Sequence, residues 1–98
     1  MKIEKMINHT EVTLTLTGRL DTTTAPELDA AIKEYMEGTA KMVLDFANLA
    51  YISSAGLRVL LAAQKTMGNR GELIIQNVNE TIMEIFDMTG FCDILTIQ

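Results

Sequence analysis

Residues 42–67 read MVLDFANLAYISSAGLRVLLAAQKTM and carry the clearest structural signals of the chain. Its first part, residues 42–46, is an apolar run interrupted by a single aspartate, which is typical of a strand buried on both faces. Its last part, residues 55–67, carries apolar side chains at helical spacing and predicts the strongest helix of the chain. Ser53 and Ser54 lie between the two. The stretch therefore predicts a strand that leads into a helix, with a pair of serines where the helix begins.

Turn signals and further elements follow on the carboxyl side. Residues 68–71, Gly-Asn-Arg-Gly, predict a turn, and residues 72–76 predict another strand. Asn79 is placed to cap a helix that carries Ile, Met and Phe at helical spacing and that ends at Gly90. Residues 94–97 predict a last short strand.

On the amino side, the pattern indicates a hairpin followed by a helix. Residues 2–6 predict a short strand, and the strict alternation of residues 11–17 indicates a strand with one buried face. These two strands are expected to pair in an antiparallel hairpin. Residues 18–21 are expected to end the second strand. Residues 24–27, Thr-Ala-Pro-Glu, match a capping box at the start of a helix that Gly38 stops.

The predicted order of elements is β-β-α-β-α-β-α-β within a chain whose length, 98 residues, suits one domain. Strand–helix–strand crossovers are right-handed and place the two joined strands parallel. We therefore expect residues 1–98 to form a single monomeric α/β domain. Its sheet should be mixed and mostly parallel, with an N-terminal antiparallel hairpin and flanking helices.

The charge and the cysteine content exclude several classes of function. The net charge of −5, from 13 acidic and 8 basic residues, argues against a nucleic-acid partner, since phosphate backbones attract clustered Lys and Arg. It also disfavours binding to an anionic membrane surface. No apolar run approaches the roughly 20 residues that span a bilayer, and the N-terminus lacks a signal peptide's apolar core. Cys92, the only cysteine, forms no intrachain disulfide. The chain is expected to be cytoplasmic.

Two segments far apart in the sequence are expected to meet. Parallel strands bring their carboxyl ends to one edge of a sheet, where the binding sites of open α/β sheets lie. Residues 18–21 follow one strand, and residues 50–56 connect the next strand to its helix. Asp21, Ser53 and Ser54 should therefore share this edge.

The two serines allow two readings. One of them can serve only as the N-cap of the helix, a position that serine favours. Alternatively, one is phosphorylated. A phosphate there would meet free backbone N–H groups and the positive end of the helix dipole, so it would add charge to an exposed edge without unfolding the helix.

The motifs of catalysis are missing, so we do not expect an enzyme. His9, the only histidine, falls in the predicted hairpin turn, at the far end of its strand from Ser54, whereas a serine nucleophile needs a base in hydrogen-bond contact. Residues 53–56, Ser-Ser-Ala-Gly, are not the G-x-S-x-G elbow, and no phosphate-binding loop is present. The scattered carboxylates form no metal-ligand cluster, and no cofactor is expected.

Three stretches together resemble the STAS domains, the family of bacterial anti-sigma factor antagonists. Residues 43–60 resemble the family signature, in which an apolar strand with a hydrophobic-Asp-hydrophobic pattern leads to Asp-Ser-[Ser/Thr]-Gly-Leu and an apolar helix. Residues 18–21, Gly-Arg-Leu-Asp, resemble the family's Gly-x-Leu-Asp turn. Residues 84–91 resemble its later helix that ends in glycine. The resemblance covers essentially the whole chain in the expected order.

The resemblance implies a protein-binding switch. In the family, an anti-sigma factor that is also a serine kinase phosphorylates the serine that matches Ser54. In this chain Ser53 replaces the family aspartate, which makes Ser53 an alternative acceptor. Unmodified, the domain binds the anti-sigma factor and frees a sigma factor for transcription. Phosphorylated, it is released, and a serine phosphatase resets it. ATP binds to the kinase rather than to this chain. The residues implied in partner binding are Asp21, Ser53, Ser54, Gly56 and Arg58.

Two alternatives stay open. The domain can be a non-catalytic STAS subunit of a larger assembly, such as a lipid-transport complex or a stress-signalling scaffold, that holds partners without turnover. It can also be a small enzyme or ligand carrier. A neighbouring kinase and phosphatase gene would favour the switch, and a transporter operon would favour the subunit.

Overall fold

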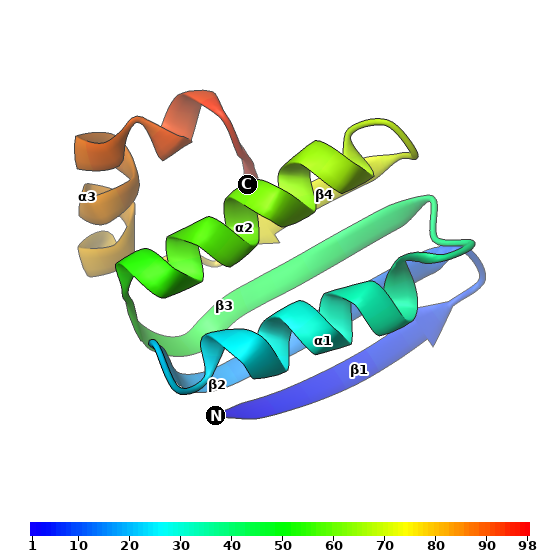
Figure 1. Ribbon diagram of the computed structural model, residues 1–98, viewed down its shortest axis with the longest axis horizontal. Coiled ribbons are helices and arrows are strands. Elements are labelled where there is room, and N and C mark those ends of the chain that lie inside the picture. Colours follow the sequence, from blue (N-terminus) through cyan, green and yellow to red (C-terminus); the bar gives the residue numbers. More distant parts are fainter.

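A computed structural model describes all 98 residues, and its elements follow the predicted order. The chain runs through β1 (Lys2–Asn8), β2 (Glu11–Leu20), α1 (Ala25–Met36), β3 (Lys41–Ile52), α2 (Ser54–Met67), β4 (Glu72–Gln76), α3 (Glu80–Thr89), a 3₁₀ turn η1 (Phe91–Asp93) and β5 (Thr96–Ile97). Figure 1 shows this path, with both helices α1 and α2 lying in front of the sheet.

The five strands form one sheet in which the order in space equals the order in the chain, β1-β2-β3-β4-β5. β1 and β2 pair antiparallel, and the other three pairs are parallel. The predicted fold class, an α/β domain on a mixed and mostly parallel sheet with an N-terminal hairpin, is confirmed.

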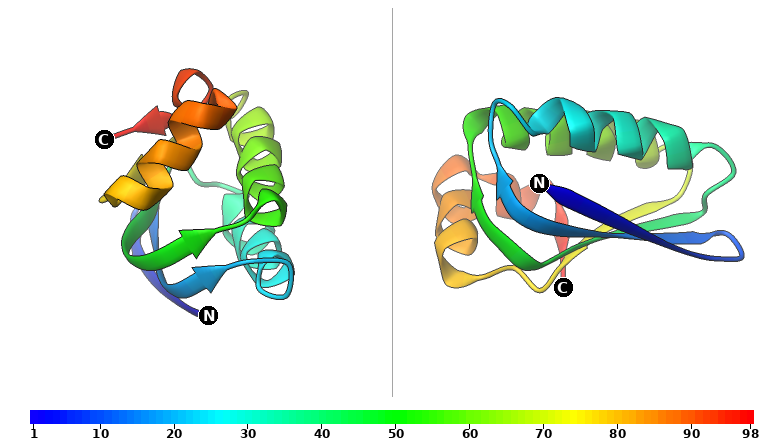
Figure 2. Two further views of the ribbon diagram at one scale, coloured as in Figure 1. Left: turned by 90° about the vertical axis from the view of Figure 1, so that its left-hand side faces the viewer. Right: turned by 90° about the horizontal axis from the view of Figure 1, so that it is seen from below.

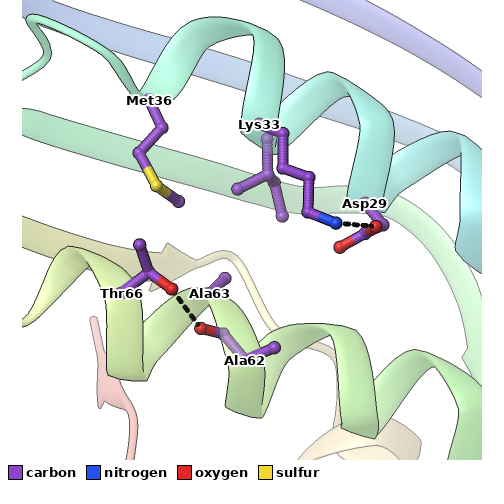
Figure 3. Close-up of a pocket in the computed structure, with 7 residues that line it drawn as sticks. Asp29, Lys33, Met36, Ala62, Ala63 and Thr66 are labelled. Atoms are coloured by element: carbon purple, nitrogen blue, oxygen red, sulfur yellow. Dashed lines mark hydrogen bonds and ion pairs between the residues drawn. The ribbon is translucent and has the colours of Figure 1, made fainter.

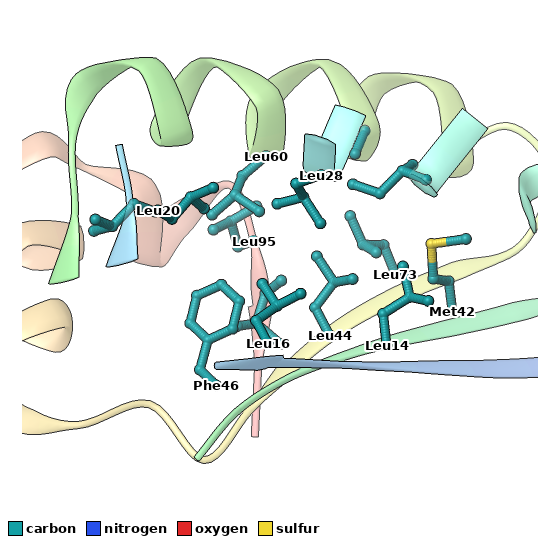
Figure 4. Packing of buried hydrophobic residues seen from close by; sticks show 14 of the residues in the cluster. Leu14, Leu16, Leu20, Leu28, Met42, Leu44, Phe46, Leu60, Leu73 and Leu95 are labelled. Carbon is teal, nitrogen blue, oxygen red and sulfur yellow. The ribbon is translucent and has the colours of Figure 1, made fainter. Parts of the chain in front are cut away.

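The core lies between this sheet and its helices. α1 and α2 lie side by side on one face, α3 lies at the end of the sheet where β3 leads into α2, and no helix covers the opposite face (Figure 2). In β2, the apolar residues of the alternating pattern are fully or nearly fully buried, and the threonines between them are half-buried. Figure 4 shows how these leucines interlock with Phe46 of β3 and Leu60 of α2. Burial of this apolar layer is the main contribution that stabilises the fold.

Three strands are longer than the sequence predicted. β1 continues through Asn8, two residues beyond its predicted end. β2 continues through Leu20 and β3 through Ile52, so both run past the end of β4 as a two-stranded ribbon. The pairing of β2 with β3 shifts register between Thr15 and Thr17 and again between Gly18 and Arg19, and the strands continue beyond both shifts. The carboxylate of Asp45 accepts hydrogen bonds from Ala47 N at 2.9 Å and from Asn77 Nδ2 at 3.0 Å, which tie β3 to the residue that follows β4. The residues that break the sequence pattern are therefore bulges within the strands and not their ends.

The helix ends confirm some predicted caps and correct one. The Asn79 side chain accepts a hydrogen bond from Ile82 N at 2.8 Å, and Gly90 ends α3 in the left-handed conformation, as predicted. The capping box at Thr24 does not form. The Thr24 hydroxyl instead accepts a hydrogen bond from Asp21 N and donates one to the Arg19 carbonyl, both at 2.8 Å. It therefore stabilises the turn before α1 and does not cap the helix. The last predicted strand is shortened to two residues by η1.

Candidate functional site

The candidate site lies where the β2–β3 ribbon ends. Leu20 pairs with Ile52 in the sheet, and the Leu20 carbonyl accepts a hydrogen bond from Ser53 N at 2.9 Å. The next residue of one strand, Asp21, and the serine pair that follows the other strand are therefore held on the same edge. The predicted meeting of the two segments is confirmed.

The two serines are placed very differently. Ser53 is the extended N-cap of α2, and its carbonyl accepts from Leu57 N at 3.0 Å. Its hydroxyl makes no capping bond, and its oxygen is buried without a hydrogen-bond partner. Ser54 is the first residue of α2 and is exposed. A modifying enzyme therefore has access to Ser54, whereas the Ser53 hydroxyl is turned away from solvent.

The carboxylate of Asp21 is engaged by the turn that leads into α1. Its Oδ1 accepts from the Thr23 hydroxyl at 2.7 Å, from Thr23 N at 3.0 Å and from Thr24 N at 3.2 Å. The hydrogen bond from the Thr23 hydroxyl is the main cause that lowers the pKa of Asp21 below its ordinary value. Asp21 is thus ionised at neutral pH and shapes the turn that stands beside the serines.

Gly56 is buried, which gives it a packing role in the site. A Cβ atom at this position would lie 2.7 Å from Leu20 Cγ and 2.8 Å from Ile52 Cγ1. The absence of a side chain therefore lets the first turn of α2 rest directly on the ends of β2 and β3. This close approach places Ser54 at the rim formed by both strands.

Arg58 contributes positive charge near Ser54, and a second arginine, Arg19, lies on the β2–β3 ribbon. Arg58 is exposed, lies one helical turn after Ser54 in α2, and forms no ion pair. Arg19 lies over the ring of Tyr51 at 4.5 Å from its centroid, a cation–π pair across the ribbon. The sequence alone does not predict this pair, because residues 18–21 look like the end of the strand. Once β2 is extended to Leu20, the register brings the two side chains opposite each other.

The other nucleophiles and bases of the chain lie apart from this edge. His9 is in the exposed β1–β2 turn with a φ of 56°, at the opposite end of β2, as predicted. The Cys92 thiol donates to Asp87 Oδ1 at 2.9 Å, and this bond is the first of the causes that raise its pKa to about 11. No three His, Cys, Asp or Glu side chains come together in a cluster suited to a metal ion. None of the α-helices has both the length and the apolar composition needed to cross a bilayer.

The sequence of the chain is similar to those of known proteins. The family model of the STAS domain matches residues 2–98. The anti-sigma-B factor antagonist of Staphylococcus epidermidis is 34% identical over 83 residues, which are 83% of this chain and 77% of that protein.

Solved structures share the fold over nearly the whole chain. An anti-sigma factor antagonist from Mycobacterium paratuberculosis superposes with a TM-score of 0.89 at 18% identity, over 98% of this chain and 83% of that one. SpoIIAA superposes with a TM-score of 0.76 in its unphosphorylated form and 0.75 in its phosphorylated form, at 18% and 19% identity. Both superpositions cover 99% of this chain. They cover 87% of the unphosphorylated SpoIIAA chain and 91% of the phosphorylated one. At these identities, the likeness concerns the fold.

Proposed function

The chain belongs to the STAS domain family, and on this premise we propose that it is an anti-sigma factor antagonist controlled by phosphorylation of Ser54. A relative at 34% identity is named an anti-sigma-B factor antagonist, which supports the first part of this proposal. The observation that supports regulation by phosphorylation is the placement of Ser54. It is exposed at the first residue of α2, on an edge that also carries Asp21 and Arg58, while the neighbouring Ser53 hydroxyl is buried.

In the unmodified state, this edge binds the anti-sigma factor. The partner is also the serine kinase that modifies the chain, so the protein is a substrate and not a catalyst. Asp21, Ser54 and Arg58 supply the polar contacts, and Gly56 supports them by seating α2 on the strands. ATP binds to the kinase, and a serine phosphatase returns the chain to its binding form.

Phosphorylation acts through charge rather than through unfolding. A phosphate on Ser54 stands at the N-terminus of a 14-residue helix, where free N–H groups and the helix dipole stabilise an anion. The fold therefore survives, and the edge gains about −1.5 to −2 charges. SpoIIAA, solved in both forms, superposes on this chain about equally well in each. In the complex, however, a charge that is desolvated without a partner costs several kcal/mol, which lowers the affinity by about 10² or more.

The first test maps the modified residue. The protein is incubated with its cognate anti-sigma kinase and ATP, and the phosphate is located by mass spectrometry. We expect phosphate on Ser54 in the wild type and in Ser53→Ala, and none in Ser54→Ala. Phosphate on Ser53 alone would overturn the assignment.

The second test measures binding. We expect Ser54→Ala to bind the kinase as the wild type does, and Ser54→Asp to bind at least tenfold more weakly. Asp carries less charge than phosphoserine, so the enzymatically phosphorylated protein should bind weakest. Equal affinity for all of these forms would contradict the switch. It would favour instead a constitutive STAS subunit that holds partners in a larger assembly.

A further inference from the structure

A groove lies between α1 and α2 and is formed by two adjoining hollows. The inner hollow has a volume of about 100 Å³, and the outer one, nearer the helix N-termini, is an open depression of about 360 Å³. Asp29 of α1 and Ala62 of α2 line both hollows, so the two are continuous. We call them together the helix groove; Figure 3 shows its inner part.

The inner part of the helix groove is apolar. Its buried lining consists of Ile32 and Met36 from α1 and Ala63 from α2. The hollow exists because the small side chains of Ala62 and Ala63 do not fill the space opposite the longer residues of α1. Figure 3 shows Met36 directed from α1 toward α2 across this space.

The polar atoms on the rim already have partners. Lys33 Nζ and Asp29 Oδ2 form an ion pair at 2.9 Å, and the Thr66 hydroxyl donates to the Ala62 carbonyl at 3.1 Å (Figure 3). None of these polar groups is therefore left unpaired in the groove and in need of a polar ligand. The inner part therefore suits an aliphatic group. A cavity of about 150 Å³ accommodates a benzene ring, so the inner hollow is of the size of a single aliphatic side chain.

The outer part of the helix groove is continuous with the Ser54 edge. It is lined by Ala55, which directly follows Ser54, by Arg58, and by Thr22 in the turn after Asp21. The Arg58 guanidinium has no acidic partner within the chain and stands at this end of the groove. An acidic group on a bound molecule would therefore be complementary to it.

We propose that the helix groove is a second docking surface for the anti-sigma factor kinase. One aliphatic side chain of the kinase, of leucine or methionine size, enters the inner hollow, and an acidic group of the same kinase pairs with Arg58. The inference rests on the proposed function. Ala62 lies eight residues after Ser54, which is about 12 Å along α2 at 1.5 Å per residue. The groove thus contributes affinity at a distance from the hydroxyl that is phosphorylated.

The decisive variant is Ala62→Leu, which fills the groove from a residue that lines both hollows. The matched control is Ala30→Leu, because Ala30 is also an exposed helical alanine but lies outside the groove. Leucine is nearly as good a helix former as alanine, so both variants should unfold at the same urea midpoint as the wild type. With the kinase and ATP, we expect Ala62→Leu to raise the KM for the protein substrate about tenfold with kcat unchanged. The Kd should rise by the same factor, and Ala30→Leu should change neither by more than about twofold.

A second pair of variants tests the charged end. Arg58→Gln should weaken kinase binding, whereas Lys65→Gln, which removes an exposed cation of α2 outside the groove, should not. In methyl NMR spectra, the Ile32 and Met36 signals should shift when the kinase is added.

The possible failures are distinguishable. If the wild type is phosphorylated on Ser54 but Ala62→Leu and Ala30→Leu have the same KM and Kd, the switch stands and the groove proposal is wrong. If the kinase neither binds nor phosphorylates the wild type, the proposed function fails and the groove proposal fails with it.

Discussion

Gly56 is the residue on which the geometry of the site depends most directly. In Gly56→Ala, the new methyl group would overlap Leu20 and Ile52, which are both almost completely buried and cannot move aside. Overpacking of this kind costs about 1–3 kcal/mol, and the better helix propensity of alanine offsets up to about 1 kcal/mol of it. We expect a net loss of unfolding free energy of about 1–2 kcal/mol, measured by urea denaturation.

A double-mutant cycle identifies the cause of that loss. In a Leu20→Ala background, the nearest clashing atoms are gone, so Gly56→Ala should cost clearly less there. The same cost in both backgrounds would show that the clash with Leu20 is not the reason.

The hydrogen bonds of Asp21 determine how the stability of the fold should depend on pH. Its pKa is lowered in the folded state, mainly by the Thr23 hydroxyl, so the ionised form stabilises the fold. That contribution is complete above the unfolded-state pKa of about 4 and is lost as the pH falls through the lower folded-state pKa. The difference in unfolding free energy between wild type and Asp21→Asn should therefore shrink as the pH is lowered from 7 to below the unfolded-state pKa of about 4. A difference that stays constant over this range, at fixed ionic strength, would contradict the assignment.

At the scale of elements, the N-caps of α2 and α3 are chemically similar but energetically different. Asn79 accepts from Ile82 N at 2.8 Å and donates to the Leu49 carbonyl at 3.0 Å, so it both caps α3 and ties it to β3. The Ser53 hydroxyl makes neither kind of bond. We expect Asn79→Ala to lower the unfolding free energy by about 1–2 kcal/mol. Ser53→Ala should change it by less than about 0.5 kcal/mol or stabilise the fold, because it removes a buried unpaired hydroxyl.

Thermal or urea unfolding of Asn79→Ala and Ser53→Ala measures the contribution of each cap to the unfolding free energy. Equal losses would mean that the Ser53 side chain caps α2 in solution. A large loss for Ser53→Ala alone would reverse the assignment of the two caps.

The elements also show which parts of the structure are readable from the sequence. β4 and the ends of α3 were predicted correctly because their signals are local: a short apolar run, a capping asparagine and a terminal glycine. The extensions of β2 and β3 were not predicted, since Gly18 and residues 47–48 look like breaks in isolation. In the sheet, each strand supplies the hydrogen bonds that hold the irregular part of the other. The edge shared by Asp21 and Ser54 followed from topology, but the burial of the Ser53 hydroxyl and the Arg19–Tyr51 pair depend on three-dimensional packing.

At the scale of the whole molecule, stability should be distributed unevenly across the sheet. β2 and β3 have paired strands on both sides, whereas β1 is an edge strand and β5 pairs through only two residues. In hydrogen–deuterium exchange measured by NMR, amides of residues 12–16 and 42–44 should exchange slowest, and those of β5 should exchange much faster. Slow exchange throughout β5 would contradict this view of the sheet.

The agreement between chain order and sheet order has a consequence for synthesis on the ribosome. Every strand pairs with the strand made just before it, so no segment has to wait for a distant one or be inserted between two others. After the hairpin, each new strand is joined to its neighbour by a single helical crossover, so no step brings together segments more distant than one strand–helix–strand unit. The nascent chain can therefore grow its sheet outward from the first hairpin, one strand at a time. Since Ser54 begins the helix that follows the third strand, the residues of its edge are all made before β4, α3 and β5.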